Sequence, residues 1–433
     1  MSSWTLTADA GARWIAPADG GPQVNRYVDF FQTFELAALP ANAHLDISAD
    51  TNYAVWINGR FAGTGQFSDY PDAKTFDTFA VRELLVTGRN TLAILLYHDG
   101  ETSSCYLAGE AGLVFRLRTE KASLAVSGTD TLWRPDLCYH SGPIARVSHQ
   151  LSFTFGYDAR PDDGWRDAGY QAGSSWTSCS AAEAHIPSGR QIIHPRPVAQ
   201  LADRGPCAVT LIGQGVFRYD MPHAEATHGG PAAVCDAASN GILMADGGAM
   251  GIGWMMQHAF MSPRSWADLC TPDNAASVLK PGVTDGSTGA WFIFDLGMET
   301  VGLPEIELDA PDGCVCDIAY GEHLEDMRVR SWVGHRSFAA RYICRAGRNA
   351  FTHRFLRWAG RYLQLFISGP LDGVTVRTVT LRRMAYPVEH RGVVRTGDTL
   401  RDRIAAVGRQ TLENCMHEHY EDTPWREQSL YAN

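Results

Sequence analysis

Two carboxylates, with an arginine and a tryptophan between them, stand near the end of this 433-residue chain. Asp422 and Glu427 are five residues apart, and Pro424, Trp425 and Arg426 lie between them. Cleavage of a glycosidic bond uses such a pair, because one carboxylic acid protonates the leaving oxygen while a second carboxylate acts on the anomeric carbon or on a water. A tryptophan offers an apolar face to a sugar ring, and an arginine can hold a carboxylate or a hydroxyl. The set therefore suits sugar chemistry, and a solvated helix end with surface charges is the plainer alternative.

The segment that positions these residues is a loop at the end of a helix. Asp398 has the side chain of an N-cap, and apolar residues recur at helical spacing from Leu400 onward. Pro424 disfavours helical geometry at Thr423, so the helix should end before it. We therefore expect Glu421 to Glu427 to leave the helix end as a loop.

The run from Arg409 to Asn433 resembles the start of the catalytic domain of bacterial α-L-rhamnosidases, glycoside hydrolase family 78. In that family a helix precedes a loop of the type Tyr-x-Asp-x-Pro-x-Arg-Glu. The resemblance implies that Glu427 is the general acid and that Asp422 binds the rhamnose. We assign Tyr420, Trp425 and Arg426 to substrate binding as well. The positions that match the motif are Tyr420, Asp422, Pro424, Arg426 and Glu427.

The family pattern also includes residues that this sequence does not contain. A further Asp is expected just beyond Asn433, and the general base on a distant helix. We therefore expect a catalytic domain truncated soon after its start, which lacks its base and is inactive alone. Thr423 stands in place of a frequent Cys, and the run from Ser429 onward differs from the common Gly-Trp-x-Gly-like run. Both departures leave the exact sugar open.

The resemblance implies an inverting, exo-acting enzyme that removes terminal rhamnose from a rhamnosylated glycoside or oligosaccharide. In inverting enzymes the two carboxyl groups stand about 6.5–9.5 Å apart, which leaves room for the attacking water. We expect Arg426 to turn toward Asp422 or Glu421, since an ion pair with Glu427 would oppose the acid role. Two alternatives stay open: a non-catalytic carbohydrate-binding protein, and a helical-barrel glycosidase for a different sugar.

Length and charge narrow the class of protein. A chain of this length predicts two to four domains with ordinary cores. The net charge of −11 argues against nucleic acid or an anionic membrane surface as a partner. No apolar run is long enough to span a membrane, and the N-terminus shows no secretory signal, so we expect a cytoplasmic location. We expect no cofactor, and we leave a homodimer, the natural aglycone and a calcium requirement open.

The ten cysteines follow neither a disulfide-framework spacing nor a zinc-finger spacing. Cys314 and Cys316 form a Cys-x-Cys pair without a second pair at metal-ligand spacing. In a strand both thiols would share one face. We interpret the cysteines as reduced thiols and expect no metal site.

The rest of the chain has the pattern of β-structure, so the expected fold class is mainly β. Two or three antiparallel β-sandwich domains, of the jelly-roll, galactose-binding-like type, should precede the first helix of an (α/α)6 barrel. The first should contain a hairpin at Asn58-Gly59. The expected segments are 1–118, a galactose-binding-like sandwich; 119–198, an accessory β region and linker, or the completion of that sandwich; 199–388, the sandwich before the catalytic domain; and 389–433, the start of the helical barrel.

Two other places hold residues that could serve a site. Phe67 to Pro71 is a loop with an acid and two aromatics, as carbohydrate modules have, although loop aromatics more often pack. Tyr320 to His323 holds an acid and an imidazole. Its plainer interpretation is packing of the sandwich against the barrel, or the rim of the pocket.

Overall fold

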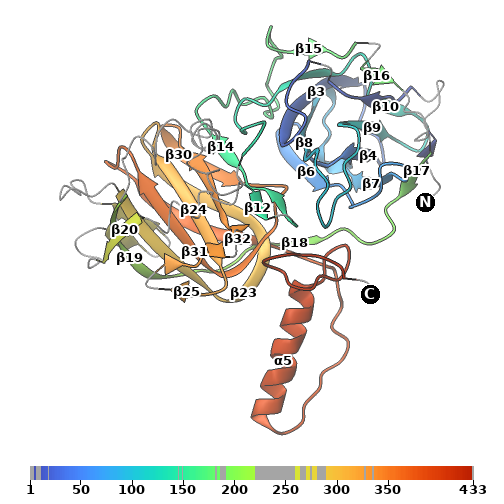
Figure 1. The fold of residues 1–433 in the computed structure, drawn as a ribbon. Coiled ribbons are helices and arrows are strands. Elements are labelled where there is room, and N and C mark those ends of the chain that lie inside the picture. Colours follow the sequence, from blue (N-terminus) through green and yellow to red (C-terminus); the bar gives the residue numbers. More distant parts are fainter. Residues whose placement is uncertain are drawn as a thin grey trace. The chain divides into compact units, whose positions relative to one another are not determined.

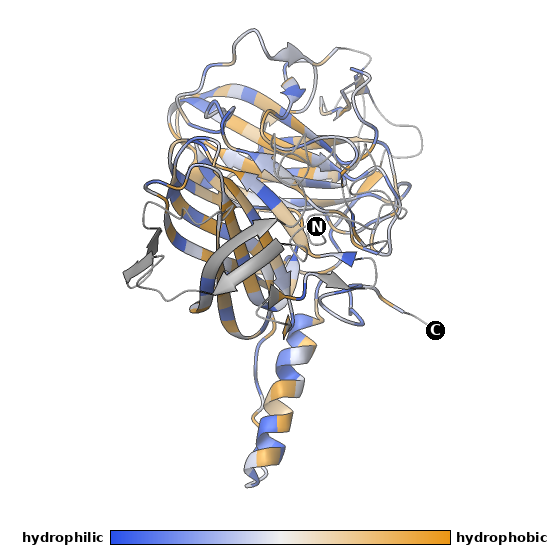
Figure 2. Ribbon diagram, turned by 60° about the vertical axis from the view of Figure 1, so that its left-hand side comes forward, coloured by the Kyte–Doolittle hydropathy of each residue, from blue (hydrophilic) through white to orange (hydrophobic). Residues whose placement is uncertain are grey.

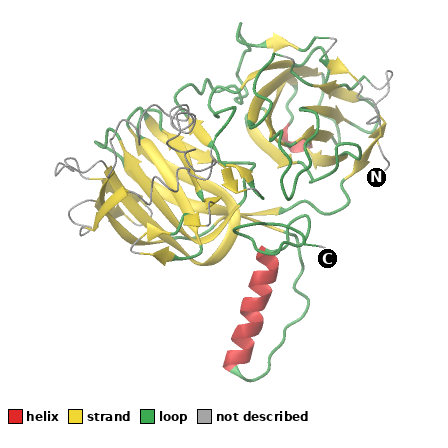
Figure 3. Cartoon of the chain, in the orientation of Figure 1, coloured by secondary structure: helices red, strands yellow, loops and turns green. Residues whose placement is uncertain are grey.

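In the computed structural model most of the chain is described, and strands dominate it (Figure 3). The structure describes residues 4–5, 11–17, 19–144, 146–148, 150–180, 183–185, 192–219, 259–263, 270–273, 276–279, 289–325, 328–333 and 336–431. The expected linker at Ile186–Arg190 and the chain end at Asn433 lie outside these residues. The prediction of a mainly β fold is confirmed, and no helix in the described part is long and apolar enough to cross a membrane.

The chain folds into two compact units, and the first comprises residues 1–143 and 161–198. One sheet of this unit has the strand order β1-β17-β7-β4-β9-β2-β16 with β10 beside β9, and the other has β15-β11-β3-β8-β5-β6. Strands from both 1–118 and 119–198 therefore take part in these sheets. The strands are β1 (Trp4–Thr5), β2 (Trp14–Ile15), β3 (Arg26–Leu36), β4 (His44–Asp50), β5 (Asn52–Ile57), β6 (Arg60–Gly65), β7 (Thr75–Ala80), β8 (Gly88–His98), β9 (Gly112–Arg118), β10 (Ser123–Val126), β11 (Leu132–Pro135), β15 (Thr177–Ser178), β16 (Ala184–His185) and β17 (Ile192–Pro195), with a short 3-10 helix at Arg82–Leu84.

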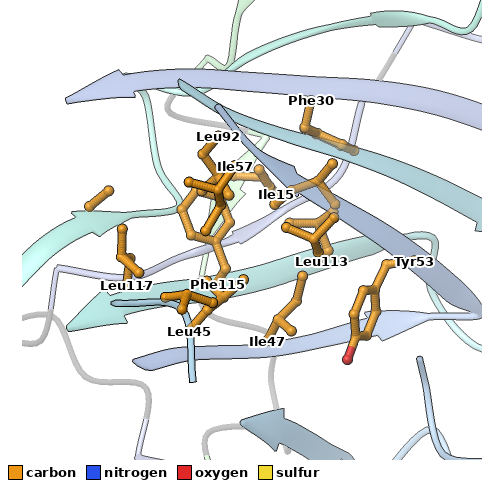
Figure 4. Close-up of a cluster of buried hydrophobic side chains, with 14 of the residues drawn as sticks. Ile15, Phe30, Leu45, Ile47, Tyr53, Ile57, Leu92, Leu113, Phe115 and Leu117 are labelled. Atoms are coloured by element: carbon orange, nitrogen blue, oxygen red, sulfur yellow. The ribbon is translucent and has the colours of Figure 1, made fainter. Parts of the chain in front are cut away.

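Alternating apolar side chains form the core between these two sheets (Figure 4). Ile47 of β4 and Phe115 of β9 come from one sheet, and Phe30 of β3 comes from the other. Because side chains point to opposite faces at successive strand positions, each strand gives one apolar row to this cluster. The expected hairpin is also present: Asn58 and Gly59 have φ values of 49° and 77°, as a type I′ turn requires.

The second unit comprises residues 144–160 and 199–433, and the long strand β23 (Gly289–Ala310) organises it. The first half of β23 pairs with β19 and the second half with β30 and β32, while β31 lies along both halves. Between Asp295 and Thr300 the register with β31 shifts, and Gly297 has a φ of 79° there. The strand thus belongs to both halves of one curled sheet.

Within the described residues this sheet has twelve strands, in the order β14-β29-β24-β31-β23-β32-β22-β21, with β18 beside β32 and β19, β20 and β30 joined through β23 (Figure 1). Its other strands are β14 (Gly156–Asp158), β18 (Ala202–Pro206), β19 (Thr210–Tyr219), β20 (Ala259–Pro263), β21 (Cys270–Asp273), β22 (Ala276–Leu279), β24 (Val315–Gly321), β29 (Ala339–Ile343), β30 (Gly347–Thr352), β31 (Trp358–Ser368) and β32 (Thr375–Ala385). The described part of the unit also contains three two-stranded ribbons: β12 (Arg146–Ser148) with β13 (Ser152–Phe153), β25 (Leu324–Glu325) with β26 (Arg328–Val329), and β27 (Trp332–Val333) with β28 (Arg336–Ser337).

The helix α5 (Thr399–Asn414) follows the second sheet, and its prediction is confirmed. Asp398 caps it by accepting hydrogen bonds from the backbone N–H groups of Leu400 and Arg401 at 2.9 and 3.2 Å. The helix ends well before Pro424, as expected. Hydrophobic residues recur along the helix (Figure 2), and Leu400, Ile404, Val407 and Leu412 are each more than half exposed. Among its described residues only Asn414, at its end, is buried.

Candidate functional site

The loop that follows α5 closes on itself through backbone hydrogen bonds. The Glu421 N–H donates to the carbonyl of Cys415 at 2.8 Å, and the Asp422 N–H donates to the carbonyl of Ser429 at 2.9 Å. The Ser429 N–H returns a bond of 3.0 Å to Asp422 Oδ1. Residues 415–431, called here the C-terminal loop, therefore form an ordered turn rather than a frayed helix end.

A buried ion pair fixes the start of this loop to the second sheet. The Arg357 guanidinium donates to Glu421, and both side chains are almost wholly buried. Burial raises the pKa of Glu421, and the nearby Arg357 charge opposes that rise. The Arg357 carbonyl also accepts a bond of 3.2 Å from the Gln428 side chain. Arg357, which lies just before β31, thus holds the loop at two points, with its side chain and with its carbonyl.

Trp425 fixes the middle of the C-terminal loop. Its side chain is 2% exposed, and its ring centroid lies 4.5 Å from that of Phe338 and 6.0 Å from that of His323. The ring therefore packs the loop onto the end of β24 and the start of β29. Its assignment to sugar binding stays a prediction, and this burial gives it a supporting role as well.

Glu427 lies between two donors from different parts of the second unit. Arg336 Nη2 in β28 is 3.3 Å from Glu427 Oε1, and the Tyr431 hydroxyl donates to Oε2 at 2.5 Å. The Glu427 side chain is 18% exposed. Contact with the carboxylate raises the pKa of Tyr431. The predicted acid is thus partly buried and held at both oxygens.

The other predicted site residues lie on the outside of the loop. Asp422 and Arg426 are exposed, and Tyr420 is 61% exposed. The expected contact of Arg426 with Asp422 or Glu421 is not found, because within the described residues Arg426 makes no ion pair and Arg357 pairs with Glu421 instead. No Arg426–Glu427 ion pair is found in the described chain, but Arg336 forms one with Glu427 at 3.3 Å, which is the kind of contact expected to oppose the acid role.

A pair of glutamates lies where α5 meets β23. Glu299 is half-buried at the bend of β23, and its carbonyl accepts a bond of 2.8 Å from the Asn414 side chain. Burial and the neighbouring Glu322 carboxylate raise the pKa of Glu299 to about 7. Glu322 belongs to the Tyr320–His323 segment, whose Tyr320 stacks on Trp358 at 4.1 Å between ring centroids and whose His323 contacts Trp425. These contacts favour the packing interpretation of that segment.

The Cys-x-Cys pair forms part of a buried thiol cluster. Cys316 Sγ is 3.7 Å from Cys344 Sγ, and Cys314 is buried beside both. Contacts with the other two thiols lower the pKa of Cys314 to about 5. Across the part of the chain that the structure describes, no group of three or more metal-binding side chains has the arrangement of a metal site.

The Phe67–Pro71 loop of the first unit is fastened to the sheet by its acid. Asp69 accepts from Lys74 Nζ at 2.6 Å, from the Thr75 N–H at 2.6 Å and from Gln66 Nε2 at 2.7 Å. Both carboxylate oxygens are therefore used internally. This arrangement favours the packing interpretation for the acid of the loop, whereas Tyr70 is 65% exposed and does not pack.

Sequence reasoning missed the residues that hold the site from a distance. Arg336 is 91 residues from Glu427 and Arg357 is 64 residues from Glu421, so no local spacing joins them. Tyr431 lies only four residues after Glu427, so a local sequence pattern could have indicated the contact of its hydroxyl with that carboxylate.

No family model and no curated protein sequence matches the chain. Among solved structures, its fold is similar to that of the GH78 family rhamnosidase of Bacillus sp. GL1, with a TM-score of 0.76, 18% identity, and 99% of this chain and 60% of that chain covered. The α-L-rhamnosidases of Aspergillus terreus and Dictyoglumus thermophilum give TM-scores of 0.62 and 0.61 at 16% and 13% identity. The matches cover 98% of this chain in both cases, and 42% and 41% of those chains. The chain thus spans 60% or less of the length of these proteins and has the fold of that part of the family 78 α-L-rhamnosidases.

Proposed function

We propose that this chain carries the general-acid side of an inverting, exo-acting α-L-rhamnosidase that removes terminal rhamnose from rhamnosylated glycosides. The observation that carries the proposal is the setting of Glu427, a partly buried carboxylate on an ordered loop that buried contacts hold against the second sheet. A solvated helix end would have neither the buried ion pair nor the buried tryptophan. The rhamnosidase fold of the whole chain supports the same conclusion.

In this proposal Glu427 gives its proton to the glycosidic oxygen as the bond to the anomeric carbon breaks. A base carboxylate from outside this sequence activates water on the opposite ring face, so the chain alone is inactive. Asp422, Arg426 and Tyr420 are exposed on the same loop and bind the sugar hydroxyls. Trp425 supports the loop from beneath and reaches the sugar only after the loop shifts.

The test is turnover of p-nitrophenyl α-L-rhamnoside by the complete product of the gene, with the first-formed anomer followed by proton NMR. The proposal predicts release of rhamnose with inverted configuration, and loss of that activity in Glu427→Gln. Glu389→Gln is the matched control, because Glu389 is an exposed glutamate that pairs with the exposed Arg391. Binding of rhamnosides without turnover would instead identify a carbohydrate-binding protein, and turnover of another sugar would identify a different glycosidase.

A further inference from the structure

The segment from β28 to the start of β29 contacts the C-terminal loop at two regularly spaced points. Arg336 contacts Glu427, and two residues further on Phe338 contacts Trp425, which lies two residues before Glu427. The contacted residue moves back from Glu427 to Trp425 as the chain advances from Arg336 to Phe338, so the two segments pass one another in antiparallel directions. Because Phe338 and Trp425 are both buried, they fix where Arg336 meets the carboxylate.

The contact of Arg336 with Glu427 is close but leaves the guanidinium incompletely bonded. The 3.3 Å between Nη2 and Oε1 is longer than the 2.7–2.9 Å usual for a charge-assisted hydrogen bond. The two side chains are 21% and 18% exposed. Arg336 Nε is buried without a hydrogen-bond partner in the described chain. Such an arginine exerts its charge on Oε1 without being locked in a two-bond pair.

The two donors around Glu427 differ in what they can do with a proton. A tyrosine hydroxyl can donate or accept, whereas a guanidinium can only donate. A proton on Oε1 would point at the Arg336 guanidinium, which has only N–H donors and cannot accept it. A proton on Oε2 meets only the Tyr431 hydroxyl, which can rotate to accept it or turn aside for substrate. Among the described residues these are the charged or titratable groups in contact with Glu427, and Asp422 acts on Tyr431 from nearby.

We propose that Arg336 is a positioning residue that keeps Oε1 of Glu427 unprotonated and directs the transferable proton to Oε2. This inference rests on the proposed function. In the reaction the O–H bond at Oε2 breaks, its proton goes to the glycosidic oxygen, and the electron pair stays on Glu427. Arg336 then stabilises the carboxylate as it forms, so its charge favours the transition state.

The experiment compares kcat and KM of the complete gene product with those of Arg336→Gln, with p-nitrophenyl α-L-rhamnoside as substrate. We expect kcat to fall about ten- to hundredfold, as for loss of a hydrogen bond to a charged group. KM should change little, because Arg336 does not touch the sugar. A purely structural arginine would change kcat and KM together.

Arg348→Gln is the matched control, since Arg348 forms an exposed pair with Glu307 in the same unit, 2.8 Å apart. Arg336→Lys keeps the charge and loses the directed N–H, so kcat should fall while KM stays unchanged. This variant decides the question should Arg336→Gln fail to fold, and an unchanged kcat in Arg336→Lys would then overturn the proposal. If Glu427→Gln is inactive while Arg336→Gln keeps its kcat, the role of Arg336 is wrong and the rhamnosidase proposal stands. If the wild-type protein turns over no rhamnoside, the proposed function itself fails.

Discussion

At the scale of single residues, the C-terminal loop depends on one buried charge pair. Glu421 and Arg357 are both buried, so water cannot solvate either charge when its partner is removed. Removal of one partner from such a pair typically costs about 3–5 kcal/mol. Arg357→Met should therefore release the loop, which hydrogen exchange of residues 415–431 would detect. The double variant Arg357→Met with Glu421→Leu should recover most of the protection, and equal exchange in the single variant and the wild type would contradict this role.

Glu299 should make the stability of the second unit depend on pH. Its pKa is raised to about 7 in the folded chain from an ordinary value of 4.5, so the folded state holds an extra proton between these values. Stability is therefore lost as the pH rises through about 7, by about 1 kcal/mol, since water screens a half-buried side chain. In urea unfolding between pH 5 and pH 8, the free energy of unfolding of Glu299→Gln should therefore fall by about 1 kcal/mol less than that of the wild type. A pH dependence identical to that of the wild type would show that the Glu299–Glu322 contact does not form.

Local sequence predicts the loop of the candidate site, but not the residues that hold this loop in place. The motif from Tyr420 to Glu427 correctly indicated a loop after a helix, because proline and the N-cap act over a few residues. The partner Arg336 lies in the β27-β28 ribbon and Arg357 lies just before β31, and tertiary packing brings both to the loop. No local spacing rule contains that information.

At the scale of elements, α5 is the least supported part of the described chain. Leu400, Ile404 and Val407 are more than half exposed, and the helix touches the sheet mainly at Asn414. A helix without packing depends on its own caps and propensities. We expect its amides to exchange faster than those of β23 and β31.

Asp398→Ala tests this directly, because loss of an N-cap costs about 1 kcal/mol. Hydrogen exchange within Thr399–Asn414 should speed up, while β31 stays unchanged. Glu389→Ala is a nearby control, since Glu389 is exposed, lies before the helix and pairs with Arg391. Helix amides as slow as those of β31 would contradict an unsupported helix.

Strand positions were largely predictable from period-two patterns, and the length of β23 was not. Alternation around Leu45 and around Leu113 matches β4 and β9. The apolar patterns of Trp291–Gly297 and Ile306–Ala310 indicate two separate strands, whereas the structure joins them in one strand with a register shift. A glycine with positive φ usually indicates a turn, but within a sheet it also permits a bulge. Which of the two occurs depends on the neighbouring strands.

At the scale of the whole molecule, the two units interrupt one another along the chain. Residues 144–160 belong to the second unit although they lie between parts of the first. Within this segment β14 pairs with β29, and Phe155 stacks on His353 with 4.0 Å between ring centroids. Burial of that imidazole lowers its pKa to about 3, which keeps it neutral.

A fragment that begins at residue 199 should therefore be unstable. It would expose the edge of β29 and remove the ring that covers His353, and open strand edges favour association. We expect it to aggregate or to unfold at a lower temperature than the second unit within the intact chain, as measured by calorimetry and light scattering. A monomeric fragment of unchanged stability would show that the inserted segment contributes little.

The most direct measurement of the central claim compares two leaving groups in Glu427→Gln of the complete gene product. General acid catalysis contributes about 10²- to 10⁴-fold to a rate, and a good leaving group needs little of it. The account predicts that kcat/KM falls by about that factor for an alkyl rhamnoside and far less for 2,4-dinitrophenyl α-L-rhamnoside. Equal losses for both substrates, or no loss for the alkyl rhamnoside, would contradict the assignment of Glu427 as the proton donor.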